Sequence, residues 1–271
     1  MSEVAVHERI VIELARRLRD GDTAILGSFT PIGYAAALLA QATHAPTLDF
    51  IAYGFGGSRV GWLGFLSVEG RARETGAGLI RTEDLVGAMR FRGLVAFEPV
   101  RPAQVDGRGR MNLRLIKTSD GGVVRLPGTA GAQEVIEMHR RPLGYMPEHS
   151  LRTLVPEVDD VSLQAHLPHQ QREPFVLVTG KAVLEFSREG WRVLSRHPGV
   201  ESAELAAETG FPLVGVDAAA ITSDPDPAVL SALRDQVDPL GVAATEMMHG
   251  RQRRQILESI FLAEEDRLEG S

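Results

Sequence analysis

The sequence contains no cysteine. Without a thiol, the chain can form no disulfide, no thiolate zinc site and no cysteine nucleophile. It also has no hydrophobic run near the ~20 residues that a membrane-spanning helix needs. Its start, Met-Ser-Glu-Val-Ala-Val-His-Glu, lacks the basic region and apolar core of a signal peptide. We therefore expect a cytoplasmic protein with no membrane partner.

Basic residues are fewer than acidic ones. The 271 residues carry a formal net charge of -7, with both signs spread along the chain. Nucleic-acid binding needs a basic stripe that neutralises phosphates, so we expect no nucleic acid as partner. What the chain does have is 44% hydrophobic residues, which is enough for a sizeable core. A globular protein that acts on small molecules or proteins fits this composition.

The segment from Thr47 to Ser58 is the first candidate site. Its apolar residues 48–52 predict a buried strand that ends at Tyr53, because the glycines that follow allow backbone conformations closed to other residues. In an open α/β sheet, ligands bind at the carboxyl ends of strands. Tyr53, Gly54 and Phe55 are therefore candidate binding residues, and a plain strand-to-loop turn is the alternative.

The chain before this strand predicts a β-α-β unit. Apolar spacing indicates a helix over residues 4–18, a strand over 23–26 and a helix over 34–42. The right-handed crossover of such a unit makes its two strands parallel. The turn at Gly27 and Ser28 does not match the spacing of known phosphate-binding loops, although it could bind a phosphate. It is either structural or faces a substrate.

A second candidate site follows a predicted hairpin. Asp106-Gly107 indicates a turn within residues 103–112, strand signals return at 113–116 and 121–125, and residues 134–139 are helical in pattern. Exposed N–H groups between strand and helix can stabilise an oxyanion or a carboxylate; close packing of small residues is the alternative. The candidates are Gly128, Thr129, Ala130, Gly131, Ala132 and Gln133.

Residues 140–171 are polar and contain proline, which predicts an irregular surface loop. His166 and His169 have a spacing that can chelate a metal, but Pro168 lies between them and no third ligand stands at a suitable distance. We predict no metal site.

The last third predicts an antiparallel meander over residues 175–194, a helix over 202–209 closed by a left-handed Gly210, and a helix over 228–237. From Met247 onward the chain predicts an amphipathic helix that packs on this subunit or on another chain. We therefore expect an α/β domain over residues 1–246, with an open, mostly parallel sheet, helices on both faces and a small meander, followed by a helix over 247–271.

In this order and spacing, several of these pieces resemble the β subunit of class I CoA-transferases, such as that of glutaconate CoA-transferase. The resemblance covers nearly the whole chain up to about residue 245 and implies a CoA-transferase/NagB-like fold. The matching pieces are residues 27–33, Ala45-Pro46, Ala103-Gln-Val-Asp106 with Gly109 and Asn112, residues 125–133, Thr209-Gly-Phe211, residues 225–229 and Asp238-Pro239.

The resemblance implies coenzyme A as part of an acyl-CoA substrate and a homologous α subunit as partner, in a heterodimer or heterotetramer. It places the oxyanion-binding N–H groups at Gly131 and Ala132. The family's catalytic glutamate falls on Tyr53. A phenol with a pKa near ~10 cannot replace a carboxylate nucleophile. We therefore predict decarboxylation, hydrolysis or C–C cleavage rather than CoA transfer, and relatives that use a cysteine here are excluded by composition.

Two alternatives remain open. The chain could belong to a true glutaconate-type CoA-transferase whose carboxylate is Glu69 or Glu74 in the glycine-rich segment after Tyr53. It could also be a non-catalytic subunit that stabilises an active partner, as the missing glutamate suggests. The survival of the glycine-rich pattern at Gly128 to Ala132 argues against the second alternative.

Overall fold

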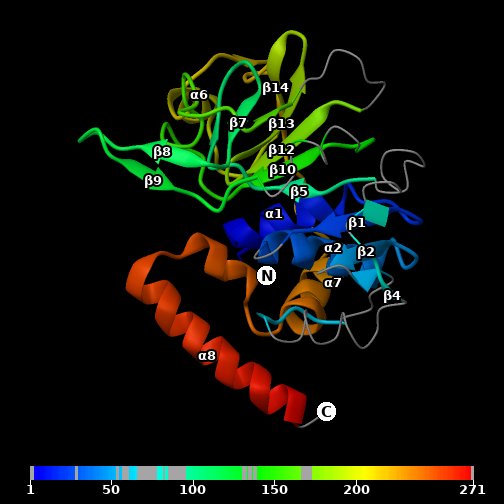
Figure 1. Cartoon of the computed structure of the whole chain (residues 1–271). Helices are drawn as coiled ribbons and strands as arrows, with labels where there is room; N and C mark the ends of the chain where they lie inside the picture. Colours follow the sequence, from blue (N-terminus) through cyan, green and yellow to red (C-terminus); the bar gives the residue numbers. More distant parts are fainter. Residues whose placement is uncertain are drawn as a thin grey trace. The chain divides into compact units, whose positions relative to one another are not determined.

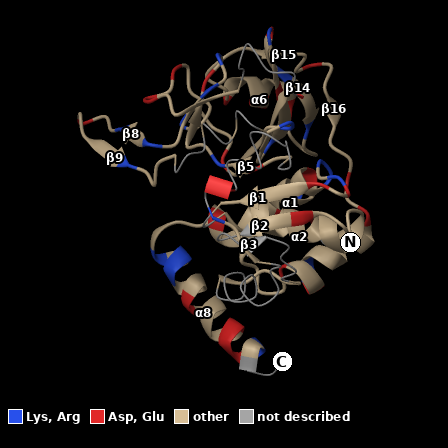
Figure 2. Ribbon diagram, turned by 45° about the vertical axis from the view of Figure 1, so that its right-hand side comes forward, with Lys and Arg blue, Asp and Glu red and all other residues tan. Residues whose placement is uncertain are grey.

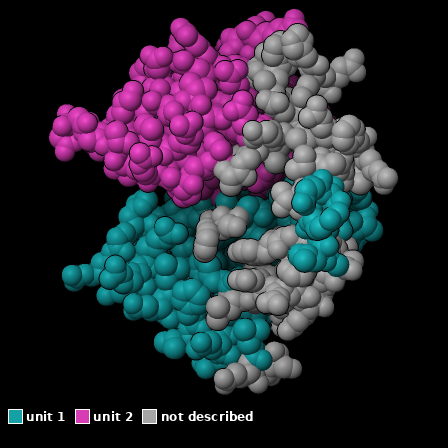
Figure 3. All heavy atoms as spheres, in the orientation of Figure 1, with its two compact units in different colours: residues 1–95, 224–271 teal, residues 96–223 magenta. Residues whose placement is uncertain are grey.

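The structure is a computed structural model that describes residues 3–27, 30–52, 55–56, 61–65, 78–81, 83–84, 96–129, 133, 136, 139–165 and 173–269. Residues 1–95 and 224–271 form one compact unit, unit 1, and residues 96–223 form unit 2 (Figure 3). The predicted division between residues 246 and 247 stays a prediction, and it does not coincide with the limits of these units. None of the described helices is long and apolar enough to cross a membrane.

Unit 1 contains the predicted β-α-β unit (Figure 1). Strand β1 (Thr23–Leu26) pairs in parallel with β2 (Asp49–Ala52), and α2 (Pro31–Thr43) connects them. The sheet then continues antiparallel through β3 (Phe55–Gly56) and β4 (Gly78–Leu79). The predicted strand is β2, which ends at Ala52, and Phe55 and Gly56 form β3 in the same sheet, with Phe55 opposite Ala52.

The helices of unit 1 explain why two distant segments fold together. Residues Pro31 to Ala40 of α2 are buried on every side of the helix, and a helix that is apolar all round has to be enclosed. It packs against α1 (Val6–Ala15), the π-helix η1 (Ala232–Val237) and the 3-10 helix η2 (Ala243–Met247).

Ion pairs add to this packing. Arg9 bonds Asp224 at 3.1 Å and Arg234 bonds Glu8 at 2.6 Å.

Helix α7 (Pro227–Ser231) is the start of the predicted helix over 228–237, and Asp226 caps it by accepting the Ala228 N–H.

The predicted C-terminal helix is α8 (Gly250–Glu269), and it packs on its own chain. Ile260 and Glu264 are buried, and the Glu264 carboxylate accepts the Phe65 N–H at 2.9 Å. The Phe261 ring lies 5.4 Å from that of Phe65, centroid to centroid.

Unit 2 is built on a mixed sheet with strand order β15-β14-β13-β12-β10-β5, and β16 also pairs with β14. The predicted meander is confirmed as β12, β13 and β14, whereas the pairs of β10 with β5 and β12 and of β14 with β15 and β16 are parallel. The strands are β5 (Pro99–Val100), β10 (Leu143–Met146), β12 (Phe175–Thr179), β13 (Ala182–Ser187), β14 (Gly190–Arg196), β15 (Leu213–Val214) and β16 (Ala220–Ile221).

Two predictions for unit 2 are wrong. Residues 140–171 are not all irregular, because β10 lies inside the sheet, between β12 and β5, with all four residues buried. A strand buried on both faces lacks the alternation that reveals a half-exposed one. Gly210, after α6 (Ser202–Ala207), is not left-handed. It is needed for close packing instead, since an added Cβ would lie 2.6 Å from the Leu154 carbonyl oxygen.

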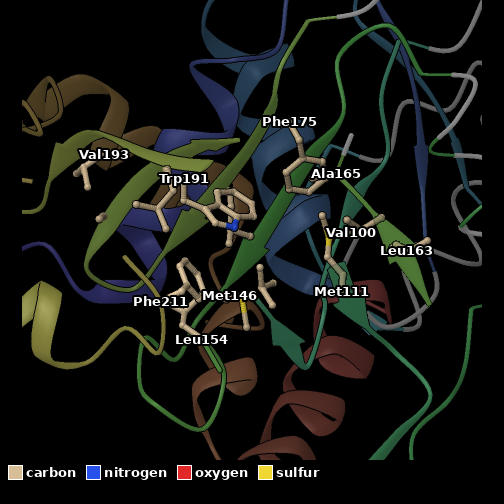
Figure 4. Close-up of a cluster of buried hydrophobic side chains, with 14 of the residues drawn as sticks. Val100, Met111, Met146, Leu154, Leu163, Ala165, Phe175, Trp191, Val193 and Phe211 are labelled. Carbon is tan, nitrogen blue, oxygen red and sulfur yellow. The ribbon is translucent and has the colours of Figure 1, made fainter. Parts of the chain in front are cut away.

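The core of unit 2 surrounds Trp191, which is fully buried (Figure 4). Its ring has Phe175 edge-on at 6.2 Å and Phe186 at 5.0 Å, measured between centroids. The indole N–H donates to the Asp106 carbonyl oxygen at 2.8 Å, which satisfies its buried polar atom. The aromatic core thereby fixes the turn at Asp106.

That turn belongs to the predicted hairpin, which is confirmed as β6 (Gln104–Val105) and β7 (Arg110–Asn112), with β11 (Leu163–Gln164) pairing on β7. The next two strands, β8 (Leu115–Lys117) and β9 (Val123–Arg125), form a separate antiparallel hairpin. We call residues 113–126 the β8–β9 hairpin.

Candidate functional site

The turn after β1 is held by contacts within unit 1. The Gly27 carbonyl accepts a hydrogen bond from Thr30 Oγ1 at 2.8 Å. The Ile32 N–H, in the first turn of α2, donates to Glu246 Oε1 at 2.8 Å, and Glu246 is buried. A carboxylate of the chain thus already lies at the helix end where an anion would be favoured. Gly27 stays a predicted binding residue, and Ser28 lies outside the described residues.

The carboxyl end of β2 is described only to Ala52. Tyr53 and Gly54 lie outside the described residues, so their roles stay predictions, and Phe55 opens β3. The carboxylate alternatives Glu69 and Glu74, and the pair His166 and His169, also lie outside the described ranges.

The described part of the chain contains no group of three or more His, Asp or Glu side chains arranged to hold a metal ion.

The start of the predicted oxyanion loop is anchored by the β8–β9 hairpin. Leu126 N–H donates to the Arg114 carbonyl at 2.9 Å, and Gly128 N–H donates to the Leu113 carbonyl at 3.2 Å. Gly128 has a φ of +98°, which favours glycine. Thr129 is half-buried, Gln133 is exposed on a helical turn, and residues 130–132 lie outside the described part. A strand does lead into Gly128 as predicted, but that strand belongs to an exposed hairpin.

A buried amide network holds the base of this hairpin. Asn112 is fully buried, and its Nδ2 donates to Gln104 Oε1 at 2.8 Å. Its Oδ1 accepts the N–H groups of Arg114 at 3.0 Å and Leu115 at 3.3 Å. Gln104 Nε2 in turn donates to Asp159 Oδ2 at 2.9 Å. A fully bonded buried network of this kind rigidifies the segments it joins.

The preceding turn is equally constrained. The buried carboxylate of Asp106 accepts the N–H groups of Arg108 and Arg110 at 3.0 and 3.1 Å and bonds Arg110 Nε at 2.7 Å. Gly109 has a φ of +72°, and an added Cβ would lie 2.7 Å from the Phe186 ring. The residues that carry the resemblance at 103–112 therefore build the support of the β8–β9 hairpin. Sequence reasoning found the turn but missed the network, because its partners lie up to 55 residues apart.

Burial also shifts titratable groups that sequence reasoning did not single out. Desolvation raises the pKa of Glu98 to about 7, and the Glu98 N–H donates to the ring of buried His139 at 3.1 Å. Glu98 precedes β5, so it lies at the amino edge of the parallel strands β5 and β10. A carboxyl that titrates near neutral pH can exchange protons, but ligand sites of α/β sheets lie at the opposite edge.

His149 is a buried histidine with a structural role. Burial, with a smaller contribution from nearby Lys181, lowers the pKa of its ring to about 3. Its two ring nitrogens bond Thr179 Oγ1 at 2.8 Å and Thr209 Oγ1 at 3.0 Å. The ring is therefore neutral and joins β12 to the segment after α6.

Comparison with known proteins places the chain in a family. No family model matches it. The chain is 31% identical to a chain of the decarboxylase AibA/AibB, with a TM-score of 0.78, over 89% of this chain and 98% of that one. Structures of variants of that decarboxylase altered at one cysteine match as well, whereas the present chain has no cysteine.

Two further relatives agree. The 3-oxoadipate CoA-transferase of Pseudomonas knackmussii has a subunit that is 26% identical over 265 residues, which cover 93% of this chain and 98% of the relative. Glutaconate coenzyme A-transferase of Acidaminococcus fermentans has the same fold, with a TM-score of 0.76 at 19% identity, over 88% of this chain and 96% of that one. The full-length similarity, together with the β-α-β unit and the Gly128 turn, leads to one conclusion: the chain belongs to the class I CoA-transferase family, as a β subunit.

Proposed function

We propose that this chain is the β subunit of a heteromeric enzyme that removes carbon dioxide from an acyl-CoA thioester. One observation carries the proposal: the relative with 31% identity over nearly the full length is a decarboxylase. The presence of tyrosine rather than an acid at position 53, where the resemblance places the family's glutamate, supports it. Hydrolysis and C–C cleavage of an acyl-CoA are the neighbouring reactions that the same polarised thioester would allow.

The chemistry requires a place for negative charge. When the C–C bond to a carboxylate breaks, carbon dioxide leaves and the electron pair moves into the thioester as an enolate, which is then protonated at carbon. In the proposed site the backbone N–H groups of Gly131 and Ala132 bind the enolate oxygen. The Tyr53 hydroxyl donates a hydrogen bond or shapes the acyl pocket. Gly27, Ser28, Gly54, Phe55, Gly128, Thr129, Ala130 and Gln133 are the proposed substrate-binding residues.

The proposed partner is a homologous α subunit. One relative is a single subunit of a CoA-transferase, and another is a protein with two components, AibA and AibB. Decarboxylation is completed when a proton donor protonates the enolate carbon, and we propose that the α subunit supplies that donor. The general base that hydrolysis would need would come from the same subunit, because residue 53 is a tyrosine and not a carboxylic acid. We expect activity only from the α/β complex.

The first test is a mass-spectrometric assay of the co-expressed α/β pair with a panel of dicarboxylic acyl-CoAs, with and without acetate. Loss of carbon dioxide without acetate supports the proposal. Free CoA without an acceptor would instead indicate hydrolysis. Acetyl-CoA formed only with acetate would overturn the proposal in favour of CoA transfer.

The second test places the site. We expect Tyr53→Phe to lower kcat. We expect Gly131→Asp to lower kcat by about 10²- to 10³-fold, the range for one oxyanion donor, because the added carboxylate repels the negative enolate oxygen although the backbone N–H remains. Gly199→Asp, at an exposed turn of unit 2 outside the β8–β9 hairpin, is the control: an added Cβ meets nothing within 4 Å, and the φ of +82° makes the substitution strained as well. Unchanged turnover in both Tyr53→Phe and Gly131→Asp would show that the site lies elsewhere.

Genuine CoA transfer is the second candidate, because the chain is 26% identical to a subunit of a 3-oxoadipate CoA-transferase. It requires a carboxylate other than residue 53, such as Glu69 or Glu74. A glutamyl-CoA intermediate that hydroxylamine or borohydride traps would support transfer. Its absence during steady turnover would exclude that route.

A further inference from the structure

The β8–β9 hairpin carries two positive charges on one face. Its register pairs Leu115 with Arg125 and Lys117 with Val123. Directly opposed residues of an antiparallel pair project from the same side, and so do residues two apart on one strand. Lys117 and Arg125 therefore share a face as diagonal neighbours. Figure 2 shows Lys and Arg on both strands of the hairpin.

Among the described residues, neither cation forms an ion pair. Lys117 and Arg125 are exposed, and their side chains have no ion-pair or hydrogen-bond partner in the described ranges. The nearby acids are otherwise engaged. Asp160 pairs with Arg114 at 3.5 Å, Asp159 accepts the backbone N–H of Lys117 at 3.1 Å, and Asp120 accepts the Gly122 N–H at 3.1 Å.

This arrangement works against the hairpin's own stability. A two-stranded hairpin is marginal in water, and two like charges without ion-pair partners on neighbouring positions of one face repel each other. The same face carries Val123, which is 55% exposed. The amide network at Asn112 nevertheless holds the start of β8 through Arg114 and Leu115, and β8 in turn pairs with β9. Charge repulsion that destabilises a segment, and that a hydrogen-bond network keeps in place, is expected at a functional surface.

The position of the hairpin indicates which anion Lys117 and Arg125 bind. Arg125 is three residues before Gly128, so at most ~10 Å of chain separates their Cα atoms. Diagonal neighbours on one face are about 7–8 Å apart, within reach of two long side chains that converge on one group. A phosphate is the anion that Arg and Lys bind together. An acyl-CoA has its phosphates at the end of the molecule opposite the thioester.

We propose that Lys117 and Arg125 form an anion-binding site for the nucleotide phosphates of the acyl-CoA. The site holds the nucleotide end of the substrate while the thioester lies at the loop that begins at Gly128. This inference rests on the proposed function, since it takes an acyl-CoA as the ligand. It adds two side chains that neither the resemblance nor the comparisons assign.

The test compares two substrates and two variants in the α/β complex. The double variant Lys117→Glu/Arg125→Glu should lower kcat/KM for the acyl-CoA by about 100-fold, taking about tenfold for each charged hydrogen bond lost. The corresponding acyl-pantetheine, which lacks the nucleotide, should be turned over equally by both enzymes. Arg188→Glu, an exposed charge reversal at another turn of unit 2, is the matched control.

A binding measurement separates this inference from the proposed function. Titration calorimetry with coenzyme A and with adenosine 3′,5′-bisphosphate requires no turnover. Weaker binding of both to the double variant would support the site even if no acyl-CoA reacted. Unchanged binding of both would overturn it, and so would equal loss of activity toward acyl-pantetheine. Competition by inorganic phosphate at the same concentrations as by the bisphosphate would overturn the assignment to the nucleotide.

Discussion

Asn112 is the residue whose replacement best tests how the Gly128 turn is positioned. Asn112→Ala removes four hydrogen bonds at the base of the β8–β9 hairpin: two that Oδ1 accepts, from the Arg114 and Leu115 N–H groups, and two that Nδ2 donates, to Gln104 Oε1 and the Leu115 carbonyl. The residue is fully buried, so water cannot replace these bonds without disturbing the core. We expect local opening of the hairpin rather than unfolding of unit 2, because the aromatic core around Trp191 stays intact.

The size of the effect follows from the bonds that hold the hairpin itself. Asn112 makes three bonds to the hairpin, two that Oδ1 accepts and one from Nδ2 to the Leu115 carbonyl, and each is worth about 1 kcal/mol net. The sum of about 3 kcal/mol corresponds to roughly a 100-fold larger open population. An isolated two-stranded hairpin has little stability of its own to absorb such a loss.

Amide hydrogen exchange of residues 113–129, followed by mass spectrometry, measures this directly. Exchange in that segment should become about 100-fold faster in Asn112→Ala, while the segment of β12 and β13 keeps its protection. Asp120→Ala is the control, because Asp120 bonds only within the exposed tip of the same hairpin. Equal exchange in the two variants would refute the reasoning, since the base would then not depend on Asn112.

Three further predictions concern stability. Gly109→Ala should lower the unfolding free energy by more than ~2 kcal/mol and Gly121→Ala by about 1 kcal/mol, measured by urea titration. Both glycines have a positive φ, but only at Gly109 would an added Cβ lie 2.7 Å from the Phe186 ring. His149 has a folded pKa of about 3, below its ordinary 6.5, so its contribution to stability is complete above pH 6.5 and is lost as the pH falls toward 3. In that range His149→Gln should reduce the dependence of the unfolding free energy on pH by about 1.4 kcal/mol per pH unit. An unchanged pH dependence would contradict this assignment. Burial raises the pKa of Asp238 to about 7, although the two N–H groups that bond its carboxylate lower it. Its contribution to stability is therefore complete below pH 3.8 and is lost as the pH rises to 7. The unfolding free energy of Asp238→Asn should not fall over that range, and a fall as steep as in the wild type would refute the assignment.

Much of the fold was predictable because local signals and tertiary structure agree. The strand at residues 23–26 and the helix that follows have the apolar spacing of their type, and the observed β1 and α2 confirm them. The hairpin at Asp106 and the meander were equally visible, because turn residues separate runs of alternating side chains. The strand β10 was missed because four buried residues between prolines have no period to detect.

The candidate site likewise has features that the sequence predicted and features that only the structure showed. Sequence order predicted a loop that starts at Gly128 and a turn at Gly27, since glycine signals are local, and their roles in binding stay predictions. It did not identify Glu246 at the start of α2, which lies 214 residues from Ile32 in the chain. It also did not identify Lys117 and Arg125 as a pair, because only the register of β8 and β9 shows that they share a face.

By itself, the sequence determined the α/β class, the elements of the β-α-β unit, the family resemblance and the exclusion of cysteine chemistry. These depend on short-range spacing and composition, which a linear chain displays directly. Only the tertiary structure decided that residues 224–271 complete unit 1, that the segment 103–112 supports the β8–β9 hairpin, and that the pKa of Glu98, His149 and Asp238 is displaced. Burial and partner choice arise from contacts between distant segments, and no local pattern encodes which segments will meet.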